Sequence, residues 1–109
     1  MDKIKRPKEV KGFTTRVRMV CGNLYITPNC DENNKLIEIF AILGKAGGCA
    51  TSQLEAITRC ISLGLKYGIP VEEYVDELKG ISCPSQSPDA LSCSDAISRI
   101  LKECVNKES

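Results

Sequence analysis

The chain has 109 residues, of which 42% are hydrophobic and 27% charged, so we expect a single globular domain that is too short for a large catalytic barrel. Aromatic residues make up only 5% and tryptophan is absent, which disfavours a stacking platform for nucleic-acid bases. No window holds the roughly 18 consecutive apolar residues of a membrane span, and no apolar signal segment follows the first residues, so we expect a cytoplasmic protein.

Residues 1–12 are predicted to form an extended basic arm or linker. They are rich in charge, contain Pro7 and Gly12, and show no apolar period. Residues 1–20 carry seven Lys or Arg against two acidic side chains, but the pI of the chain is only 7.5. We therefore interpret the arm as a solvated linker, and nucleic-acid binding is disfavoured.

Three strands are predicted after the arm. Residues 13–21 alternate between apolar and polar, residues 24–27 follow a turn at Gly22, and the apolar, β-branched residues 36–43 follow a polar loop at 28–35. The connections are short, which favours a three-stranded antiparallel meander.

Three helices are predicted after the sheet, because beyond residues 44–48 the apolar period changes from 2 to 3.6 residues. The first is long and ends at Gly68, and the second covers residues 71–78 with Gly80 as its stop. The third is C-terminal and is capped by Ser92 or Ser94. The apolar stripe of the long helix consists of Leu54, Ile57, Ile61 and Leu65.

These elements predict an α+β fold in which a long, a short and a C-terminal helix pack on one face of the sheet. The predicted domain covers residues 13–105, and residues 106–109 form a tail. We expect no catalytic residue, because the chain has no histidine and therefore no Cys-His or Ser-His-Asp arrangement.

Seven cysteines, an odd number in a chain without a signal segment, favour metal binding or thiol chemistry over a set of disulfides. Four of them lie at strand ends, at helix starts or beside a proline, where unpaired backbone amides lower the pKa of a thiol. These four are Cys21, Cys49, Cys83 and Cys93. No CxxC motif is present, so the spacing leaves open both a four-cysteine metal site and a set of unligated thiols.

The other three cysteines have structural interpretations. Cys60 and Cys104 lie on amphipathic helices and are predicted to be small, buried apolar residues. Cys30 falls in the predicted polar loop, where we expect an incidental exposed thiol.

Five segments resemble the TSCPD domain, the small module at the C-terminal end of adenosylcobalamin-dependent ribonucleoside-diphosphate reductases. They extend from about Arg6 to Leu101 and read RPKEVKGFT, VCGNLYIT, FAILGKAGGCATSQLEAITRCISLGLKYGI, ELKGISCPS and LSCSDAISRIL. In the last segment Leu91 and Ser94 stand where the family motif has Thr and Pro. The resemblance implies that the cysteines of the family's CG, GGC, CPS and TSCPD motifs correspond to Cys21, Cys49, Cys83 and Cys93.

A fainter similarity links the chain to U-type iron-sulfur scaffold proteins. It rests on the Cys-Gly at the end of an early strand, the glycine-cysteine turn before the long helix, and Asp95-Ala96-Ile97 after a late cysteine. This similarity implies a scaffold-like fold in which the cysteines converge at one end of the sheet.

The resemblance to the TSCPD domain implies an accessory module that is linked to ribonucleotide reduction and does not reduce nucleotides alone. Cys21, Cys49, Cys83 and Cys93 would hold one metal ion, with zinc preferred and an iron-sulfur cluster as the alternative. Adenosylcobalamin would belong to the associated reductase, whose catalytic part is the expected partner.

Several alternatives stay open at the level of the sequence. A pair such as Cys83 and Cys93 could relay electrons by thiol-disulfide exchange. The turn at Cys49 suggests an iron-sulfur or persulfide carrier. A homodimer, and whether the chain has any enzymatic activity of its own, are also open.

Overall fold

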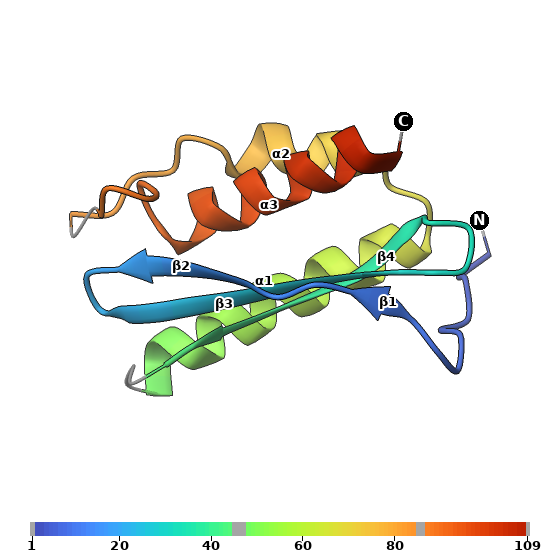
Figure 1. Ribbon diagram of the computed structural model, residues 1–109, viewed down its shortest axis with the longest axis horizontal. Coiled ribbons are helices and arrows are strands. Elements are labelled where there is room, and N and C mark those ends of the chain that lie inside the picture. The colour runs from blue at the N-terminus through green and yellow to red at the C-terminus, as the bar shows by residue number, and fades with distance from the viewer. Residues whose placement is uncertain (1, 45–47, 85–86, 109) are drawn as a thin grey trace.

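A computed structural model describes residues 2–44, 48–84 and 87–108 and shows an α+β fold, the predicted class (Figure 1). The sheet is formed by β1 (Lys11–Gly12), β2 (Thr15–Met19), β3 (Gly22–Cys30) and β4 (Leu36–Leu43). The helices that follow are α1 (Gly48–Lys66), α2 (Val71–Leu78) and α3 (Cys93–Glu108).

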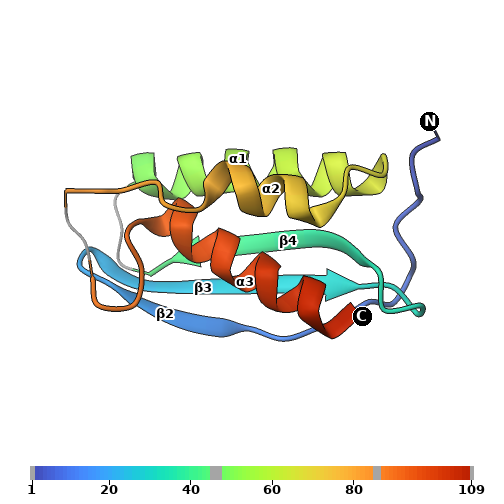
Figure 2. The ribbon, with the colours of Figure 1, turned by 90° about the horizontal axis from the view of Figure 1, so that it is seen from above.

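The helices divide their contacts between the sheet and one another. α3 crosses over β3 and β2, α2 packs on α3, and α1 runs alongside β4 (Figure 2). In the described residues none of the helices has the length and hydropathy that a membrane crossing requires.

The sheet has four strands, so the prediction of three was wrong. β1 and β2 both pair antiparallel with the same edge of β3, and β4 pairs with the other edge. The last pair of β1 is Gly12 with Asn29 and the first pair of β2 is Thr15 with Ile26, so the break between the two strands faces Thr27 and Pro28.

Pro28 provides the physical reason for this break. On its other side it pairs with Ile39, whose N–H points away from β3 to the hydroxyl of Ser62 at 3.0 Å. The nitrogen of Pro28 therefore faces the edge on which β1 and β2 pair, and it has no hydrogen to donate there.

β3 is longer than predicted, because residues 28–30 belong to the strand and not to the loop. Asn29 and Cys30 pair with β1 on one edge and β4 on the other. The Asn29 amide also donates to the buried carboxylate of Glu38 at 2.8 Å. Polar composition indicated a loop, but pairing on both edges determines the structure.

The core lies between the sheet and the helices, and α1 packs along β4 rather than with α2 and α3 on one face as predicted. In α1, Leu54, Ile61 and Leu65 are buried, whereas Ile57 is only partly buried. The sheet and α3 contribute further fully buried residues, including Leu24, Ile26, Ile39, Ile97 and Leu101. α1 also buries Thr58 and Ser62.

The helix ends follow the predicted stop and cap signals. Gly68 and Gly80 have φ angles of 94° and 79°. After α1 the N–H of Ile69 bonds the carbonyl of Gly64 at 3.0 Å and that of Gly68 bonds Leu65 at 3.1 Å, which is a Schellman motif. Of the two serines proposed to cap α3, Ser92 does so: its hydroxyl accepts the N–H of Asp95 at 3.0 Å.

The N-terminal arm is bound to the domain. The N–H of Ile4 bonds the carbonyl of Lys66 at 2.8 Å, and Arg6 bonds Glu38. Residues 11–12 form β1. The arm thus follows a fixed path across the ends of α1 and β4.

The predictions for the three cysteines interpreted as structural are confirmed for one of them and wrong for the other two. Cys104 is buried, as predicted. The burial prediction for Cys60 was wrong, because Thr58, Ile61 and Ser62 face the sheet and leave Cys60 exposed. The prediction of an exposed loop thiol at Cys30 was also wrong: Cys30 ends β3 and packs partly buried against the core.

Candidate metal centre

One end of the molecule gathers the segments that carry the four candidate ligands. The β2–β3 turn, the start of α1 and the loop that leads into α3 lie at this end in both views (Figures 1 and 2). Cys21 lies in the turn, Cys49 is the second residue of α1, Cys83 lies in the loop and Cys93 begins α3.

Glycines shape the approach to Cys21. Gly22 has a φ of 140°, and a Cβ at this position would collide with the carbonyl oxygen of Gly44. The N–H of Gly44 in turn bonds the carbonyl of Asn23 at 2.9 Å. The turn that carries Cys21 therefore lies against the end of β4. Residues 45–47, part of the glycine turn predicted to position Cys49, lie outside the described residues.

Cys83 and Cys93 lie on neighbouring backbone segments. The N–H of Cys83 bonds the carbonyl of Leu91 at 2.9 Å, which joins the two ends of the loop between α2 and α3. Ser92 caps α3, so Cys93 follows directly as the first helical residue.

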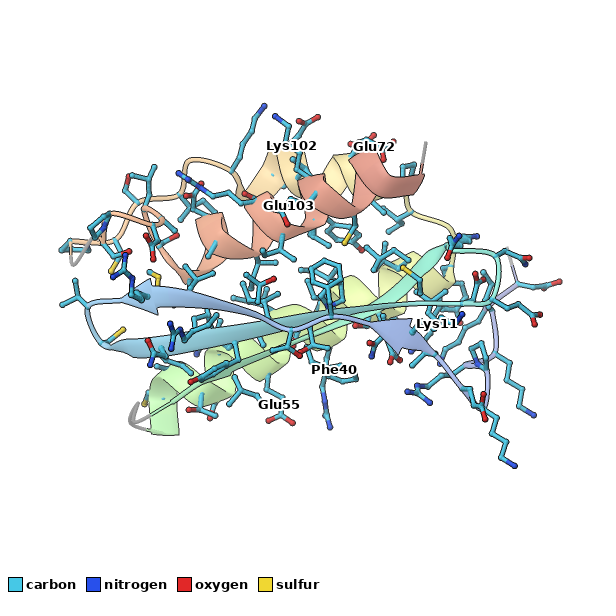
Figure 3. All side chains as sticks on the ribbon, in the orientation of Figure 1. Lys11, Phe40, Glu55, Glu72, Lys102 and Glu103 are labelled. Atoms are coloured by element: carbon cyan, nitrogen blue, oxygen red, sulfur yellow. The ribbon has the colours of Figure 1, made fainter. Side chains whose placement is uncertain are left out.

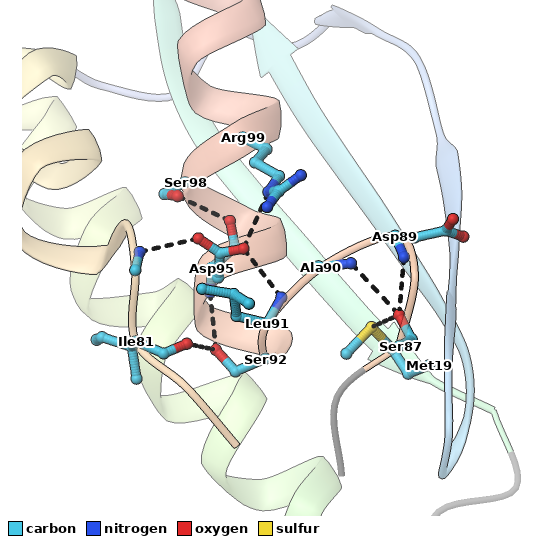
Figure 4. A network of polar contacts seen from close by, with 11 residues as sticks. Met19, Ile81, Ser87, Asp89, Ala90, Leu91, Ser92, Asp95, Ser98 and Arg99 are labelled. Carbon is cyan, nitrogen blue, oxygen red and sulfur yellow. Dashed lines mark hydrogen bonds and ion pairs between the residues drawn. The ribbon is translucent and has the colours of Figure 1, made fainter. Parts of the chain in front are cut away.

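A buried carboxylate, Asp95, fixes this arrangement (Figure 4). One oxygen accepts the N–H of Gly80 at 2.9 Å, and the other accepts the N–H of Leu91 at 3.1 Å and Nε of Arg99 at 2.9 Å. The Ser92 hydroxyl donates to the carbonyl of Ile81 at 2.6 Å. Both ends of the loop are thereby tied to the first turn of α3.

A second set of bonds ties the loop to β2, and Figure 4 shows those of Ser87, including its contact with the sulfur of Met19 at 3.9 Å. The Ser87 hydroxyl accepts the N–H groups of Asp89 and Ala90 at 3.1 and 3.3 Å. The Asp89 carboxylate accepts the backbone N–H of Arg18 at 3.2 Å and its Nε at 3.3 Å. These contacts bring the loop to the end of β2, which lies two residues before Cys21.

The thiol of Cys93 is within range of the charges of Cys21 and Cys83. Burial raises the pKa of Cys93, and the charges of Cys21 and Cys83 raise it further, against a smaller opposing effect of its backbone hydrogen bond. Cys49 is at the same end of the molecule but is not among the groups that act on Cys93. Two of the other three candidate ligands thus act on the charge of Cys93.

The direction of this pKa shift differs from the sequence-based expectation. We expected a helix start to lower thiol pKa values, but at Cys93 burial and neighbouring sulfur outweigh the backbone. At Cys93, burial and the negative charges of the neighbouring thiolates both favour the protonated thiol. A cation at the centre would reverse this preference and draw the thiolates together.

The four cysteine thiols are chemically suited to bind a thiophilic metal. All four cysteines are free of disulfides, and no imidazole is available. Four thiolates suit tetrahedral zinc or an iron-sulfur cluster. Within residues 2–44, 48–84 and 87–108, no three cysteine or acidic side chains already stand in a metal-binding arrangement.

The positioning residues Ser87, Asp89 and Asp95 were missed by sequence reasoning. One signal was available: Ser92 and Asp95 have the spacing of a capping box before an apolar run. The bonds from Asp95 to Gly80 and from Asp89 to Arg18 span the loop and the sheet, and no local pattern encodes them.

Comparison with known proteins gives one family. The family model described as TSCPD domain matches residues 2–105. No solved structure gives a significant match.

Several curated proteins similar to this chain are named vitamin B12-dependent ribonucleotide reductase. That of Bradyrhizobium diazoefficiens is 33% identical over 72 residues, which is 66% of this chain and 6% of the relative. That of Streptantibioticus cattleyicolor is 32% identical over 71 residues, 65% of this chain and 12% of the relative. The aligned region therefore covers a small part of much longer proteins.

Proposed function

Because the chain belongs to the TSCPD family, we propose that it is an accessory module of ribonucleotide reduction in which Cys21, Cys49, Cys83 and Cys93 hold one zinc ion. The observation that carries the proposal is that the segments with the four cysteines meet at one end of the molecule, where Cys21 and Cys83 act on the charge of Cys93. These thiols come from three separate segments, and the bonds of Asp95 and Asp89 hold two of those segments together.

The role proposed for the metal is structural. Zinc bound by four thiolates has no open position for a substrate and supplies a cross-link between chain segments. The protein's own residues would prepare this site: Ser92 starts α3 at Cys93, Asp95 holds the Cys83 loop, and Gly22 lets the Cys21 turn approach β4.

The proposed partner is the catalytic part of a ribonucleotide reductase. The aligned region covers 6% of the relative from Bradyrhizobium diazoefficiens, so the reduction itself and the use of adenosylcobalamin would belong to that partner. We propose that the module acts in the cytoplasm, where it would meet such an enzyme.

A thiol relay is the second candidate, favoured by the short hydrogen-bonded loop between Cys83 and Cys93. The two thiols would reduce a disulfide of the partner and form a Cys83–Cys93 disulfide, transferring two electrons and two protons. The raised pKa of Cys93 works against this role, because thiolates attack disulfides and thiols do not. An iron-sulfur or persulfide carrier with a scaffold-like arrangement is the remaining alternative.

Metal analysis of protein purified without chelator tests the proposal. We expect about one equivalent of zinc per chain and a colourless anaerobic sample, whereas a total of zinc and iron below about half an equivalent would contradict it. A brown sample with visible absorbance would support the iron-sulfur alternative. Metal-free protein in which all four thiols react freely would support the relay.

A further inference from the structure

The face of the sheet opposite α2 and α3 exposes apolar side chains. Phe40 points away from α2 and α3 in Figure 3. Tyr25, Phe40 and Ile42 are 39%, 48% and 63% exposed, and Tyr25 pairs directly with Ile42. Large apolar residues gathered on one surface mark an interaction site more often than isolated ones do.

A groove of about 530 Å³ continues this surface between β4 and α1. Phe40, Ala41 and Ile42 line it on the strand side, and Thr58 and Leu63 line it on the helix side. Leu63 is 50% exposed, so both walls of the groove are partly apolar.

The strand side of this groove is a sheet edge. Because Ile39 directs its N–H outward, the alternation of an antiparallel strand directs the N–H and C=O of Ala41 outward as well. At Ile39 the Ser62 hydroxyl satisfies both groups, at 3.0 and 3.1 Å.

At Ala41, two residues farther along β4, none of the described side chains of α1 bonds the outward backbone groups in this way. The Thr58 hydroxyl bonds the carbonyls of its own helix at Leu54 and Glu55, at 2.9 and 3.3 Å. Among the described residues no hydrogen bond to the backbone of Ala41 is found outside its own sheet. Ala41 is only 9% exposed, and its outward backbone groups face the floor of the groove.

Cations collect at the end of the groove nearest the arm. Lys3 and Lys66 line it there. The carboxylate of Glu38 is shared between Lys66 at 4.0 Å and Arg6 at 2.8 Å, so positive charge exceeds negative charge. Farther along, Glu55 and Arg59 form an ion pair and cancel each other.

We propose that this groove binds an extended segment of a partner protein, apolar at alternate positions and acidic at one end. The segment hydrogen-bonds to the edge of β4 at Ala41, contacts Phe40 and Ile42, and carries its carboxylates toward Lys3 and Lys66. None of the four candidate ligand cysteines lines the groove, so the inference does not depend on the metal.

Selection from displayed random peptides of about twelve residues, longer than a typical strand, tests the proposal on the full-length chain. We expect enrichment of alternating apolar sequences with Asp or Glu at one end. Synthetic versions should shift the amide resonances of residues 39–43. Methylation of the peptide nitrogen that faces Ala41 should weaken binding about tenfold, because the backbone bond is lost.

Matched variants locate the binding. Phe40→Ser and Ile42→Ser should each weaken peptide binding about tenfold, whereas Tyr67→Ser, an aromatic residue 40% exposed and outside the groove, should not. Lys3→Glu should weaken it about fivefold, and Lys102→Glu on α3 should leave it unchanged.

Several outcomes would overturn the proposal. One is that no peptide class is enriched, and another is that the enriched peptides bind the groove variants and N-methylated forms equally well. A single-stranded DNA oligonucleotide that competes more strongly than the peptides would assign the face to nucleic acid. A concentration-dependent dimer that protects residues 39–43 would assign it to a second copy.

Discussion

Arg6 holds the buried carboxylate of Glu38 with two hydrogen bonds, from Nε to Oε1 at 2.8 Å and from Nη2 to Oε2 at 3.1 Å. The two residues are 32 positions apart, and Glu38 is 1% exposed. This pair ties the N-terminal arm to the sheet, and a paired arrangement of this kind is strongly preferred by a buried charge.

Replacement of Arg6 should release the arm. In Arg6→Gln the Glu38 carboxylate keeps Asn29 and Lys66 but loses its two strongest bonds, so the arm should exchange between bound and free states. Hydrogen exchange at the Ile4 amide, which bonds Lys66, should become much faster. Lys8→Gln, at an exposed arm position, serves as the control, and equal exchange in both variants would contradict the role of Arg6.

The same carboxylate should make stability depend on pH. Burial alone would raise the pKa of Glu38, but hydrogen bonds from Arg6 and Asn29 and the charges of Arg6 and Lys66 bring it below its ordinary value of 4.5. The unfolded chain therefore binds the proton more readily. The stabilisation is complete above the unfolded pKa and is lost as the pH falls through the lowered folded value.

Urea unfolding of the wild type and Glu38→Gln measures this contribution. We expect the difference in unfolding free energy to be largest near about pH 7 and to shrink as the pH falls toward about 3. A difference that stays constant with pH would show that Glu38 contributes through packing and not through its charge.

Removal of one candidate ligand should remove the metal. In Cys93→Ser we expect zinc content to fall and the unfolding free energy to drop by about 2.7 kcal/mol where free zinc exceeds Kd a hundredfold. Cys60→Ser, at an exposed cysteine outside the site, should change neither quantity. Excess chelator should bring the wild type to the stability of Cys93→Ser, and a chelator-insensitive wild type would argue against the site.

Loss of the Asp95 carboxylate should loosen the loop that carries Cys83. Asp95→Ala leaves the N–H groups of Gly80 and Leu91 without their acceptor, which should cost about 2–4 kcal/mol. Asp95→Asn keeps one acceptor oxygen and should lose less. Chemical denaturation measures the stability, and thiol labelling of Cys83 should accelerate in parallel.

Asp76→Asn is the matched control for Asp95. Asp76 also has a basic partner, Lys79 at 3.4 Å, but its side chain is 69% exposed. We expect its replacement to change stability by less than about 0.5 kcal/mol. A similar loss in both variants would mean that the buried network of Asp95 has no special role.

The sequence predicts the fold class and the helices well because their signals are local. The apolar stripe of α1 and the positive φ angles of Gly68 and Gly80 arise from the residues themselves. β1 and the last three residues of β3 could not be predicted in this way. They depend on pairing between residues 11–12 and 29–30, which the composition of neither segment indicates.

In the candidate site, too, the features with a local sequence signal were predictable and those that depend on distant contacts were not. The positions of Cys21, Cys83 and Cys93 at element ends were visible in the sequence, and in the structure Cys21 and Cys83 act on the charge of Cys93. The charge environment was not visible, because the burial that raises the pKa of Cys93 depends on how the loop packs. The partners of Asp95 were not visible either, because Gly80 lies 15 residues away.

The break between β1 and β2 opposite Pro28 limits how copies of this protein can aggregate. A long, continuous strand edge recruits strands from other molecules, and this edge is divided into runs of two and five residues. Arg16 adds an exposed positive charge to the longer run, and Arg18 beside it pairs with Asp89. At high concentration this edge of the sheet is thereby protected from pairing with strands of other copies.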